Sequence, residues 1–314
     1  RLNKTVPVSF AVAISVARDC FSFVQEYSPY LLKELYGMAA SSGVSVERLM
    51  LLQVRNQLQA EAEAGCTSFS TTVSQTSGSE TIVAQNWDND PLLDSFTIML
   101  TRKPEGKPAF MSLTQAGLIA YIGVSENAVG VCLNTLPAPS RRVGVPHYFL
   151  IRKFFECATL AECVDAVDRT ERAIPANVML ATPQGPANLE ITVDEVRVLE
   201  KNKSGMVTHS NHCVHPDLTA INGKFPELID SHARKRRIDA MFANAPMPRS
   251  VERMQEFLRD HDNHPRSICR HANDHPEHGF WTTVFSVVIE AGAGRIHASR
   301  GNPCEQPYEV YELG

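Results

Sequence analysis

The first part of the chain has apolar residues at helical spacing. Leu31, Leu35 and Met38 recur every three or four positions, which places them on one face of an amphipathic helix. Ser45 precedes a leucine-rich run in the way that residues at helix starts do. These signals predict a helical region over residues 9–62.

From Cys66 onward the pattern changes to short β-branched segments separated by turn residues. Such segments are typical of strands in antiparallel sheets. We predict strands at 66–73, 80–87, 95–102, 108–114, 118–124 and 128–134. For the rest of the chain we predict helices at 146–172, 226–243 and 251–259, and strands within 177–199 and at 284–289, 295–299 and 308–311.

Blocks of strands therefore alternate with blocks of helices. This order favours a layered α+β domain over a series of βαβ units. Residues 1–314 contain no internal repeat, low-complexity segment or convincing linker, so we predict a single domain. A chain of 314 residues, 43% of them apolar, is long enough to bury a sizeable core.

Charge and hydropathy argue against two kinds of partner. The formal net charge is −5, and no basic stripe is interleaved with aromatic residues, so nucleic acid is not an expected partner. No run of about 18 apolar residues occurs, so we expect no membrane partner. The basic run at 232–237 lies in helical sequence, and we interpret it as a solvated helix face rather than a binding patch.

The eight cysteines are scattered, without the compact spacing of small secreted scaffolds. We therefore expect a reducing, cytoplasmic compartment and mostly buried free thiols. The chain begins at Arg1 without a methionine, so we expect the natural N-terminus and any targeting signal to lie upstream.

The bond between Gly65 and Cys66 lies where helical sequence gives way to β sequence. A cysteine that opens a strand is compatible with an ordinary buried thiol. It is equally compatible with a nucleophile that becomes an N-terminus when the chain cuts itself at this bond.

The residues after Cys66 predict a β-hairpin. Two β-rich runs flank the turn cluster at 74–79, which contains Gly78. A hairpin centred near Ser77 places Asp88 opposite Cys66, within one residue of register. The hairpin is therefore expected to bring a carboxylate to the cysteine.

A thiol with an ordinary pKa of about 8.5 needs a base to act as a nucleophile at neutral pH. If the Gly65–Cys66 bond is cut, the freed α-amine of Cys66 can be that base, because its reference pKa is about 7.7–8.0. Asp88 could then orient the ammonium group. Without cleavage the local sequence offers no obvious base. On spacing alone, a core cysteine near an aspartate that ends a hairpin remains the competing interpretation.

Several motifs are similar to one known family. The run from Gly65 to Phe69 (GCTSF) and the run from Gln85 to Asp88 (QNWD) resemble the acyl-coenzyme A:6-aminopenicillanic acid acyltransferase (isopenicillin N acyltransferase) family. This is the C45 peptidase family of the N-terminal nucleophile (Ntn) hydrolases. Further matching segments, in order, lie at 37–44, 51–55, 123–134, 208–212, 258–271 and 300–304.

The resemblance implies a four-layer αββα sandwich, with two antiparallel sheets between helix layers. It implies that Cys66 is the nucleophile and that the chain is a precursor cut between Gly65 and Cys66. The segments 1–65 and 66–314 would then remain together as a heterodimer, with Asp88 holding the new α-amine. The family's first glycine-rich strand would precede Arg1.

The same resemblance suggests two oxyanion donors. Asn211, in the run from Thr208 to His212 (THSNH), would donate its side-chain amide to the tetrahedral intermediate. Asn134 lies where the related bile-acid hydrolases place a second donor. One such donor is typically worth about 10²–10³ in rate. The competing interpretation is that each asparagine caps a turn.

Further residues are assigned to the site with weaker support. Arg300 is expected to orient Cys66 or Asp88, with a surface ion pair as the alternative. The residues that we expect at the substrate are Gln85, Trp87 and Tyr121; strand aromatics that simply fill the core are the alternative for the last two.

Histidines and cysteines crowd residues 261–278, as zinc ligands often do. Their spacing matches no standard zinc pattern, and proline and arginine interrupt it. We therefore expect no metal and no cofactor, and interpret this stretch as an ordered loop near the mouth of the active site.

Taken together, the residues favour a self-processing amidohydrolase that cleaves a linear amide of a small N-acyl compound. The alternative is an acyl-coenzyme A-dependent N-acyltransferase of the penicillin-biosynthesis type, because both reactions use the same catalytic groups. A non-catalytic protein is disfavoured, because Cys66 and Asp88 are both present. The sequence leaves the substrate's identity and any homo-oligomer open.

Overall fold

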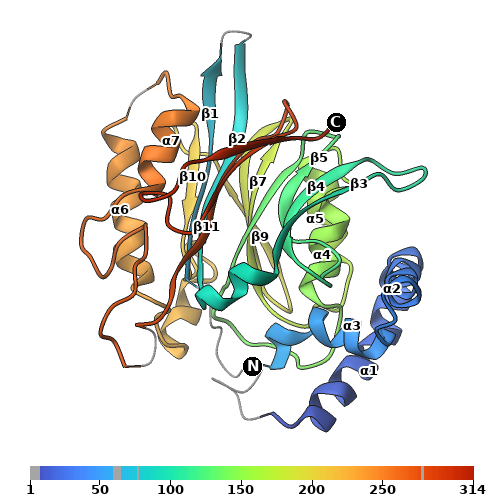
Figure 1. Ribbon diagram of the computed structural model, residues 1–314. Coiled ribbons are helices and arrows are strands. Elements are labelled where there is room, and N and C mark those ends of the chain that lie inside the picture. The colour runs from blue at the N-terminus through green and yellow to red at the C-terminus, as the bar shows by residue number, and fades with distance from the viewer. Residues whose placement is uncertain (1–7, 59–64, 76–77, 246, 277–278) are drawn as a thin grey trace.

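The computed structural model describes residues 8–58, 65–75, 78–245, 247–276 and 279–314. Within these ranges the chain folds into two stacked antiparallel sheets with helices on both outer faces (Figure 1). The predicted four-layer αββα sandwich is confirmed.

The first sheet, as far as the described residues define it, has the strand order β10-β1-β2-β11-β12-β13. Its strands are β1 (Gly65–Gln75), β2 (Gly78–Asn89), β10 (Met206–His209), β11 (Thr282–Glu290), β12 (Arg295–Arg300) and β13 (Glu309–Glu312). Strand β10 was not predicted from the sequence. It has four residues, which is too short to carry a clear alternation, and among the residues that the structure describes it pairs with β1 alone, at the sheet edge.

The second sheet runs in chain order, with each strand beside the next, over the residues that the structure describes. Its strands are β3 (Thr97–Arg102), β4 (Phe110–Gln115), β5 (Ile122–Ser125), β6 (Gly130–Asn134), β7 (Ala176–Thr182), β8 (Gly185–Ile191) and β9 (Val196–Glu200). All neighbours are antiparallel, and short connections suffice for such pairs.

The predicted N-terminal helical region is confirmed as far as residue 58, and 59–62 lie outside the described residues. It consists of α1 (Phe10–Tyr27), α2 (Pro29–Ser42), α3 (Val46–Gln53) and the 3₁₀ helix η1 (Arg55–Leu58). Ser45 is the N-cap of α3, because its side chain accepts a hydrogen bond from the Arg48 backbone N–H. These helices lie beside the second sheet (Figure 1).

The remaining helices cover the two outer faces. Helices α4 (His147–Phe154) and α5 (Leu160–Asp168) lie on the second sheet, and α6 (Ser231–Ala243) and α7 (Val251–Leu258) lie on the first (Figure 1). Short 3₁₀ helices are η2 (Pro91–Phe96) and η3 (Thr219–Lys224). Helix α6 begins five residues later than predicted, because Ile229 and Asp230 have positive φ angles that a helix cannot accommodate.

Alternate side chains of the central strands belong to two different buried clusters, one on each face of the sheet. Cys66, Val83 and Trp87 belong to the large core between the sheets. Ile82 and Ala84, on the opposite face of β2, pack beneath α6 and α7. Because successive side chains of a strand point to opposite faces, the thiol of Cys66 faces the space between the sheets. No described helix is both long and apolar enough to cross a membrane.

Candidate active site

The β1–β2 hairpin positions the predicted nucleophile and carboxylate. Gly65 pairs with Asp88, and Cys66 pairs with Trp87. This register differs by one residue from the pairing of Cys66 with Asp88 and lies within the predicted margin. A shift of one residue changes the face of the sheet on which a side chain lies. Cys66 therefore shares its face with Trp87, and Asp88 lies across from the glycine.

Gly65 has little space for a side chain. A Cβ atom added there would lie 3.2 Å from Ile229 Cδ1 and 3.3 Å from Asp88 Oδ2. Either distance is shorter than an ordinary van der Waals contact. The glycine therefore lets the Asp88 carboxylate approach the backbone next to the Gly65–Cys66 bond.

Cys66 is almost fully buried in the continuous chain. Its backbone N–H donates to Asn211 Oδ1 at 2.9 Å. Burial, and then the charge of Asp88, raise the pKa of the Cys66 thiol to about 12, although Gln85 and the Asp88 backbone N–H favour the thiolate. The thiol is therefore neutral at physiological pH, and a base must take its proton before it can attack.

Asp88 is a buried carboxylate with one free oxygen. Oδ1 accepts a hydrogen bond from Thr283 Oγ1 at 2.7 Å, whereas Oδ2 has no hydrogen-bond partner among the described residues. Burial raises the pKa of Asp88 to about 6, against the opposing effects of Arg234, Thr283 and Arg270. The group is thus mostly ionised at pH 7 yet much more basic than an exposed aspartate, as a general base requires.

Arg234 is a site residue that the sequence analysis missed. The basic run at 232–237 was interpreted as a solvated helix face, but Arg234 is fully buried. Its guanidinium donates to the Cys66 carbonyl, to Thr67 Oγ1 at 2.9 Å and to Asn211 Oδ1 at 2.7 Å. The helical spacing between Arg234 and the apolar residues that follow it indicated that this side chain would be buried.

Arg234 lies four and eight residues before Ile238 and Phe242, and these three side chains form the buried face of α6. The other members of the basic run are partly or fully exposed. One basic side chain of the run is therefore turned toward the nucleophile, and its charge offsets part of the cost of burying Asp88.

Asn211 is held in one orientation. Its Oδ1 accepts from both Cys66 N and Arg234 Nη2, and its Nδ2 donates to the Thr135 carbonyl at 3.0 Å. Exchanging O and N would place donors against donors, so the hydrogen-bond network determines this orientation. The carboxamide oxygen of Asn211, rather than its NH₂ group, thus faces the nitrogen of Cys66.

Asn134 and Gln85 link the two sheets near Cys66. Gln85 Nε2 donates to the Leu133 carbonyl at 2.6 Å and to Asn134 Oδ1 at 3.2 Å, and Asn134 Nδ2 donates to the Ser210 carbonyl at 2.8 Å. All of these groups are buried. Gln85 therefore fixes the end of β6 while also stabilising the thiolate form of Cys66.

Arg300 does not lie where it was predicted. Its guanidinium forms a two-pronged ion pair with Asp94, and its side chain is 79% exposed. Cys66 and Asp88 are both buried. The structure therefore does not bring Arg300 to either of them, and it shows instead the surface ion pair that was the alternative. Its position near the end of β12 directs the side chain toward η2, away from the β1–β2 hairpin.

The predicted aromatic residues lie beside Cys66. Trp87 stacks on Phe285 with ring centres 4.9 Å apart and meets Tyr121 edge to face at 6.0 Å. All three rings are buried in the core between the sheets. They form an apolar wall around the thiol, a property that fits both a core and an acyl pocket.

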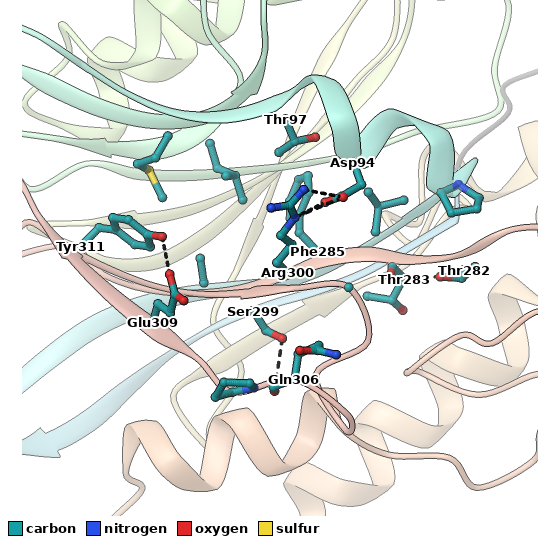
Figure 2. A pocket seen from close by; sticks show the side chains of 17 residues that line it. Asp94, Thr97, Thr282, Thr283, Phe285, Ser299, Arg300, Gln306, Glu309 and Tyr311 are labelled. Atoms are coloured by element: carbon teal, nitrogen blue, oxygen red, sulfur yellow. Dashed lines mark hydrogen bonds and ion pairs between the residues drawn. The ribbon is translucent and has the colours of Figure 1, made fainter.

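A pocket of about 670 Å³ opens next to this wall (Figure 2). Figure 2 shows Arg300 and Asp94 turned toward each other in this pocket. Thr283 and Phe285, which both belong to β11, also line it. Cys66 is not among its lining residues. The pocket approaches the site through Thr283, which bonds Asp88, and Phe285, which stacks on Trp87. In the continuous chain the thiol is thus closed off from it.

Comparison with known proteins gives a consistent group of relatives. The 40 kDa form of acyl-coenzyme A:6-aminopenicillanic-acid-acyltransferase from Emericella nidulans is 24% identical over 304 residues, covering 94% of this chain and 82% of the relative. Among solved structures, an N-acylethanolamine-hydrolyzing acid amidase ortholog from Caenorhabditis elegans has a TM-score of 0.52 at 20% identity, covering 72% of this chain and 93% of that one.

A conjugated bile acid hydrolase variant from Clostridium perfringens has a TM-score of 0.53 at 13% identity, covering 78% of this chain and 97% of that one. At these identities the two solved structures establish a shared fold. The sequence profile described as acyl-coenzyme A:6-aminopenicillanic acid acyl-transferase matches residues 74–304, well over half of the chain. This protein therefore belongs to the acyl-coenzyme A:6-aminopenicillanic acid acyl-transferase family.

Proposed function

We propose that this protein is a self-processing cysteine amidohydrolase. It cuts its own Gly65–Cys66 bond and then hydrolyses a linear amide of a small N-acyl compound. One observation carries the proposal. Asp88 is a buried carboxylate with a raised pKa, and its unpartnered oxygen lies against Gly65. The nitrogen of the Gly65–Cys66 bond donates a hydrogen bond to Asn211.

The self-cleavage begins with the neutral Cys66 thiol. Asp88 accepts the thiol proton while the sulfur attacks the Gly65 carbonyl carbon. The carbon–nitrogen bond then breaks, the proton passes to the leaving nitrogen, and a thioester joins Gly65 to the sulfur. Water hydrolyses this thioester and leaves a Gly65 carboxylate, a free thiol and the α-amine of Cys66. The raised pKa of Asp88 suits this proton transfer.

The α-amine is the base for the second reaction. It replaces a backbone N–H that already lies 2.9 Å from Asn211 Oδ1, so its position is set before cleavage. The amine takes the thiol proton, and the thiolate attacks the substrate carbonyl. The substrate's amine leaves with that proton, and water, activated by the same α-amine, hydrolyses the Cys66 thioester.

Asn211 and Asn134 are the proposed donors to the oxyanion. In the continuous chain each NH₂ group already donates to a backbone carbonyl, Thr135 for Asn211 and Ser210 for Asn134. An NH₂ group has two hydrogens, so one remains for the tetrahedral intermediate. An amide suits this task because it donates without titrating.

The two segments created by cleavage, 1–65 and 66–314, remain one domain in this proposal. Leu35 and Met50 from the N-terminal helices belong to the same buried cluster as Cys66 and Trp87. Cleavage of one peptide bond removes none of this apolar contact. Gln85, Trp87 and Tyr121 are the proposed acyl-binding residues, because they surround the thiol.

Acyl transfer from acyl-coenzyme A to an amine is the second candidate. The fungal relative is an acyltransferase by name and matches nearly the whole chain, which supports this candidate. By name, two of the similar structures are an amidase and a hydrolase. The same thioester serves both reactions, and the acceptor, water or amine, distinguishes them.

Intact mass under denaturing conditions tests the proposal. The purified full-length chain is expected to give two fragments that divide between Gly65 and Cys66, and Cys66→Ala is expected to give one. An uncut chain that still hydrolyses amides would exclude the α-amine as the base. Supplying the cut enzyme with acyl-coenzyme A and an amine, and separately with simple amides, then measures transfer against hydrolysis.

A further inference from the structure

Four potential metal ligands from two loops converge beside α7. His261, Cys269 and His271 lie in the loop between α7 and β11, and Cys304 lies in the loop between β12 and β13. One ligand atom from each residue lies within 4.8 Å of all the others. We propose that these side chains bind one structural Zn²⁺ ion. This inference does not depend on the proposed amide chemistry.

The distances between the ligand atoms fit a tetrahedron. With Zn–S bonds of about 2.3 Å and Zn–N bonds of about 2.0 Å, its edges are about 3.8 Å between two sulfurs and about 3.5 Å between sulfur and nitrogen. Cys269 Sγ and Cys304 Sγ are 3.7 Å apart. His271 Nε2 lies 3.8 Å from the first sulfur and 3.3 Å from the second.

The fourth ligand needs a small adjustment. Nε2 of His261 lies 2.9 Å from Nε2 of His271, whereas two nitrogens bound to one zinc are about 3.3 Å apart. His261 is exposed, so its ring can move outward by roughly this difference without displacing the core. At 3.7 Å the two sulfurs are not joined in a disulfide, whose S–S bond is about 2.05 Å.

The ligand set favours zinc over other divalent ions. Two thiolates and two imidazoles in a tetrahedral arrangement are typical of structural Zn²⁺ sites, whereas Mg²⁺ and Ca²⁺ prefer oxygen ligands. Binding would release the two thiol protons to solvent and leave two thiolates on the ion. With four protein ligands the site is closed, so its role is structural.

Groups around the four ligands complete the site. Glu305 Oε1 lies 3.7 Å from Nδ1 of His271, the ring nitrogen that would face away from the ion. Asn302 Nδ2 donates to Cys269 Sγ at 3.5 Å. A carboxylate behind a histidine ligand and a hydrogen bond to a thiolate are the usual outer partners of protein zinc.

The ion would join two loops that support Asp88. Cys269 and His271 flank Arg270, whose backbone N–H donates to Thr283 Oγ1 at 3.0 Å. Thr283 Oγ1 in turn donates to Asp88 Oδ1. Cys304 reaches the same place from the loop that follows β12. The ion would therefore brace the strand end that orients the carboxylate.

Sequence spacing could not reveal this set. Cys304 lies 33 residues after His271, beyond the crowded stretch, and His264 and His275 within that stretch are not in the cluster. The expectation of no metal rested on the spacing within this stretch, on the proline and arginine that interrupt it, and on the resembling family, which has the matching segment without needing a metal. The proposal replaces it with an arrangement that only the tertiary structure brings together.

The test is metal analysis of the full-length chain. The protein is purified without a histidine tag under reducing conditions, equilibrated with Zn²⁺, passed over a desalting column and analysed by elemental mass spectrometry. About one zinc per chain is expected. Replacing zinc with Co²⁺ should give the ligand-field bands of a tetrahedral site and a thiolate-to-cobalt charge-transfer band. The cobalt spectrum uses the wild-type chain, so it does not depend on whether a variant folds.

Cys304→Ser and His261→Gln are each expected to lower zinc affinity more than about 100-fold, because the loss of a direct ligand exceeds the 10–100-fold effect of an outer partner. Glu305→Gln should have that smaller effect. His215→Gln, which changes a partly buried histidine outside the cluster, is the matched control and should bind like wild type. A folded wild-type chain that retains no zinc, an octahedral cobalt spectrum, or full binding by Cys304→Ser would overturn the proposal.

Discussion

Asp88 lies directly across the β1–β2 hairpin from Gly65, and its free Oδ2 would be 3.3 Å from a Cβ atom at that glycine. The carboxylate thus sits beside the residue that precedes the nucleophile. A side chain at this position would crowd the carboxylate, so glycine leaves the most room for it.

Replacement of Gly65 should slow self-cleavage in proportion to side-chain size. Gly65→Ala presses on Ile229 and Asp88, and Gly65→Val presses harder, so each shifts the proposed base from its position. A misplacement of about 1 Å can cost about 10²-fold in rate. We expect a slowing of about tenfold for alanine and about 10²-fold or more for valine, measured on gels after cell-free translation.

Gly37→Ala is the matched control, because an added Cβ there meets nothing within 4 Å. It should cleave at the wild-type rate. Equal cleavage by wild type and Gly65→Val would show that the contact with Asp88 is unimportant.

Asp88 should make the uncut chain less stable as pH rises. Its pKa in the folded chain, about 6, lies above its ordinary value of 3.8, so the folded state holds the proton more tightly than the unfolded state. The resulting stabilisation is fully present below pH about 3.8 and is lost as pH rises through about 6. A difference of about two pH units corresponds to about 3 kcal/mol.

The pH dependence is measured by urea unfolding of two proteins that cannot cleave themselves. One carries Cys66→Ala alone, and the other carries Cys66→Ala together with Asp88→Asn. The stability difference between the two proteins should change by about 2.4 kcal/mol between pH 4 and pH 7, because at pH 4 part of the full effect has already been lost. The asparagine variant should gain relative stability as pH rises. A constant difference would mean that Asp88 titrates normally.

Loss of Arg234 should destabilise the chain and should also shift the pH dependence of the cleavage rate to higher pH. Arg234→Met removes the guanidinium that donates to the Cys66 carbonyl, removes one of the two donors to Asn211 Oδ1, and leaves the Asp88 charge less compensated. We expect a loss of about 3–5 kcal/mol in unfolding free energy. Because Arg234 lowers the pKa of Asp88, the midpoint of the cleavage-rate profile should move up from about pH 6.

Arg236→Met is the control for this change, since Arg236 is exposed on the same helix. It should alter stability by no more than about 0.5 kcal/mol. If both variants behaved alike, the burial of Arg234 would have no consequence for the site.

Arg300→Met should leave self-cleavage unchanged. Its guanidinium pairs with Asp94 at the surface, where solvent screens the ion pair, so the pair contributes little to stability. Cleavage kinetics and urea midpoints compared with wild type measure this. A cleavage defect of tenfold or more would instead restore the role first expected for Arg300.

Much of the fold follows from the sequence because its signals are local. The hairpin needed only two β-branched runs around a short turn, and the pairing of Gly65 with Asp88 fell within one residue of expectation. The remaining difference of one residue in the register is important, because it decides the face of the sheet on which each side chain lies. The turn's local sequence does not contain enough information to set it.

The candidate site was predictable in part. Asp88 and Asn211 lie where the motifs placed them around Cys66, and Asn134 lies nearby through Gln85. Arg234 was missed because the basic run was interpreted from its charge, whereas the helical spacing that places Arg234 on the buried face was not considered. Arg300 was misplaced because a motif near a strand end does not show which way a long side chain turns.

The sequence by itself determined the helices, most strands, the hairpin and the glycine–cysteine boundary, because periodicity and turn chemistry act over a few residues. Only the tertiary structure decided the burial that raises the pKa of Cys66 and Asp88, the inward turn of Arg234, and the meeting of His261, Cys269, His271 and Cys304. These depend on segments far apart in the chain, and their proximity is set by how the two sheets and their helices pack.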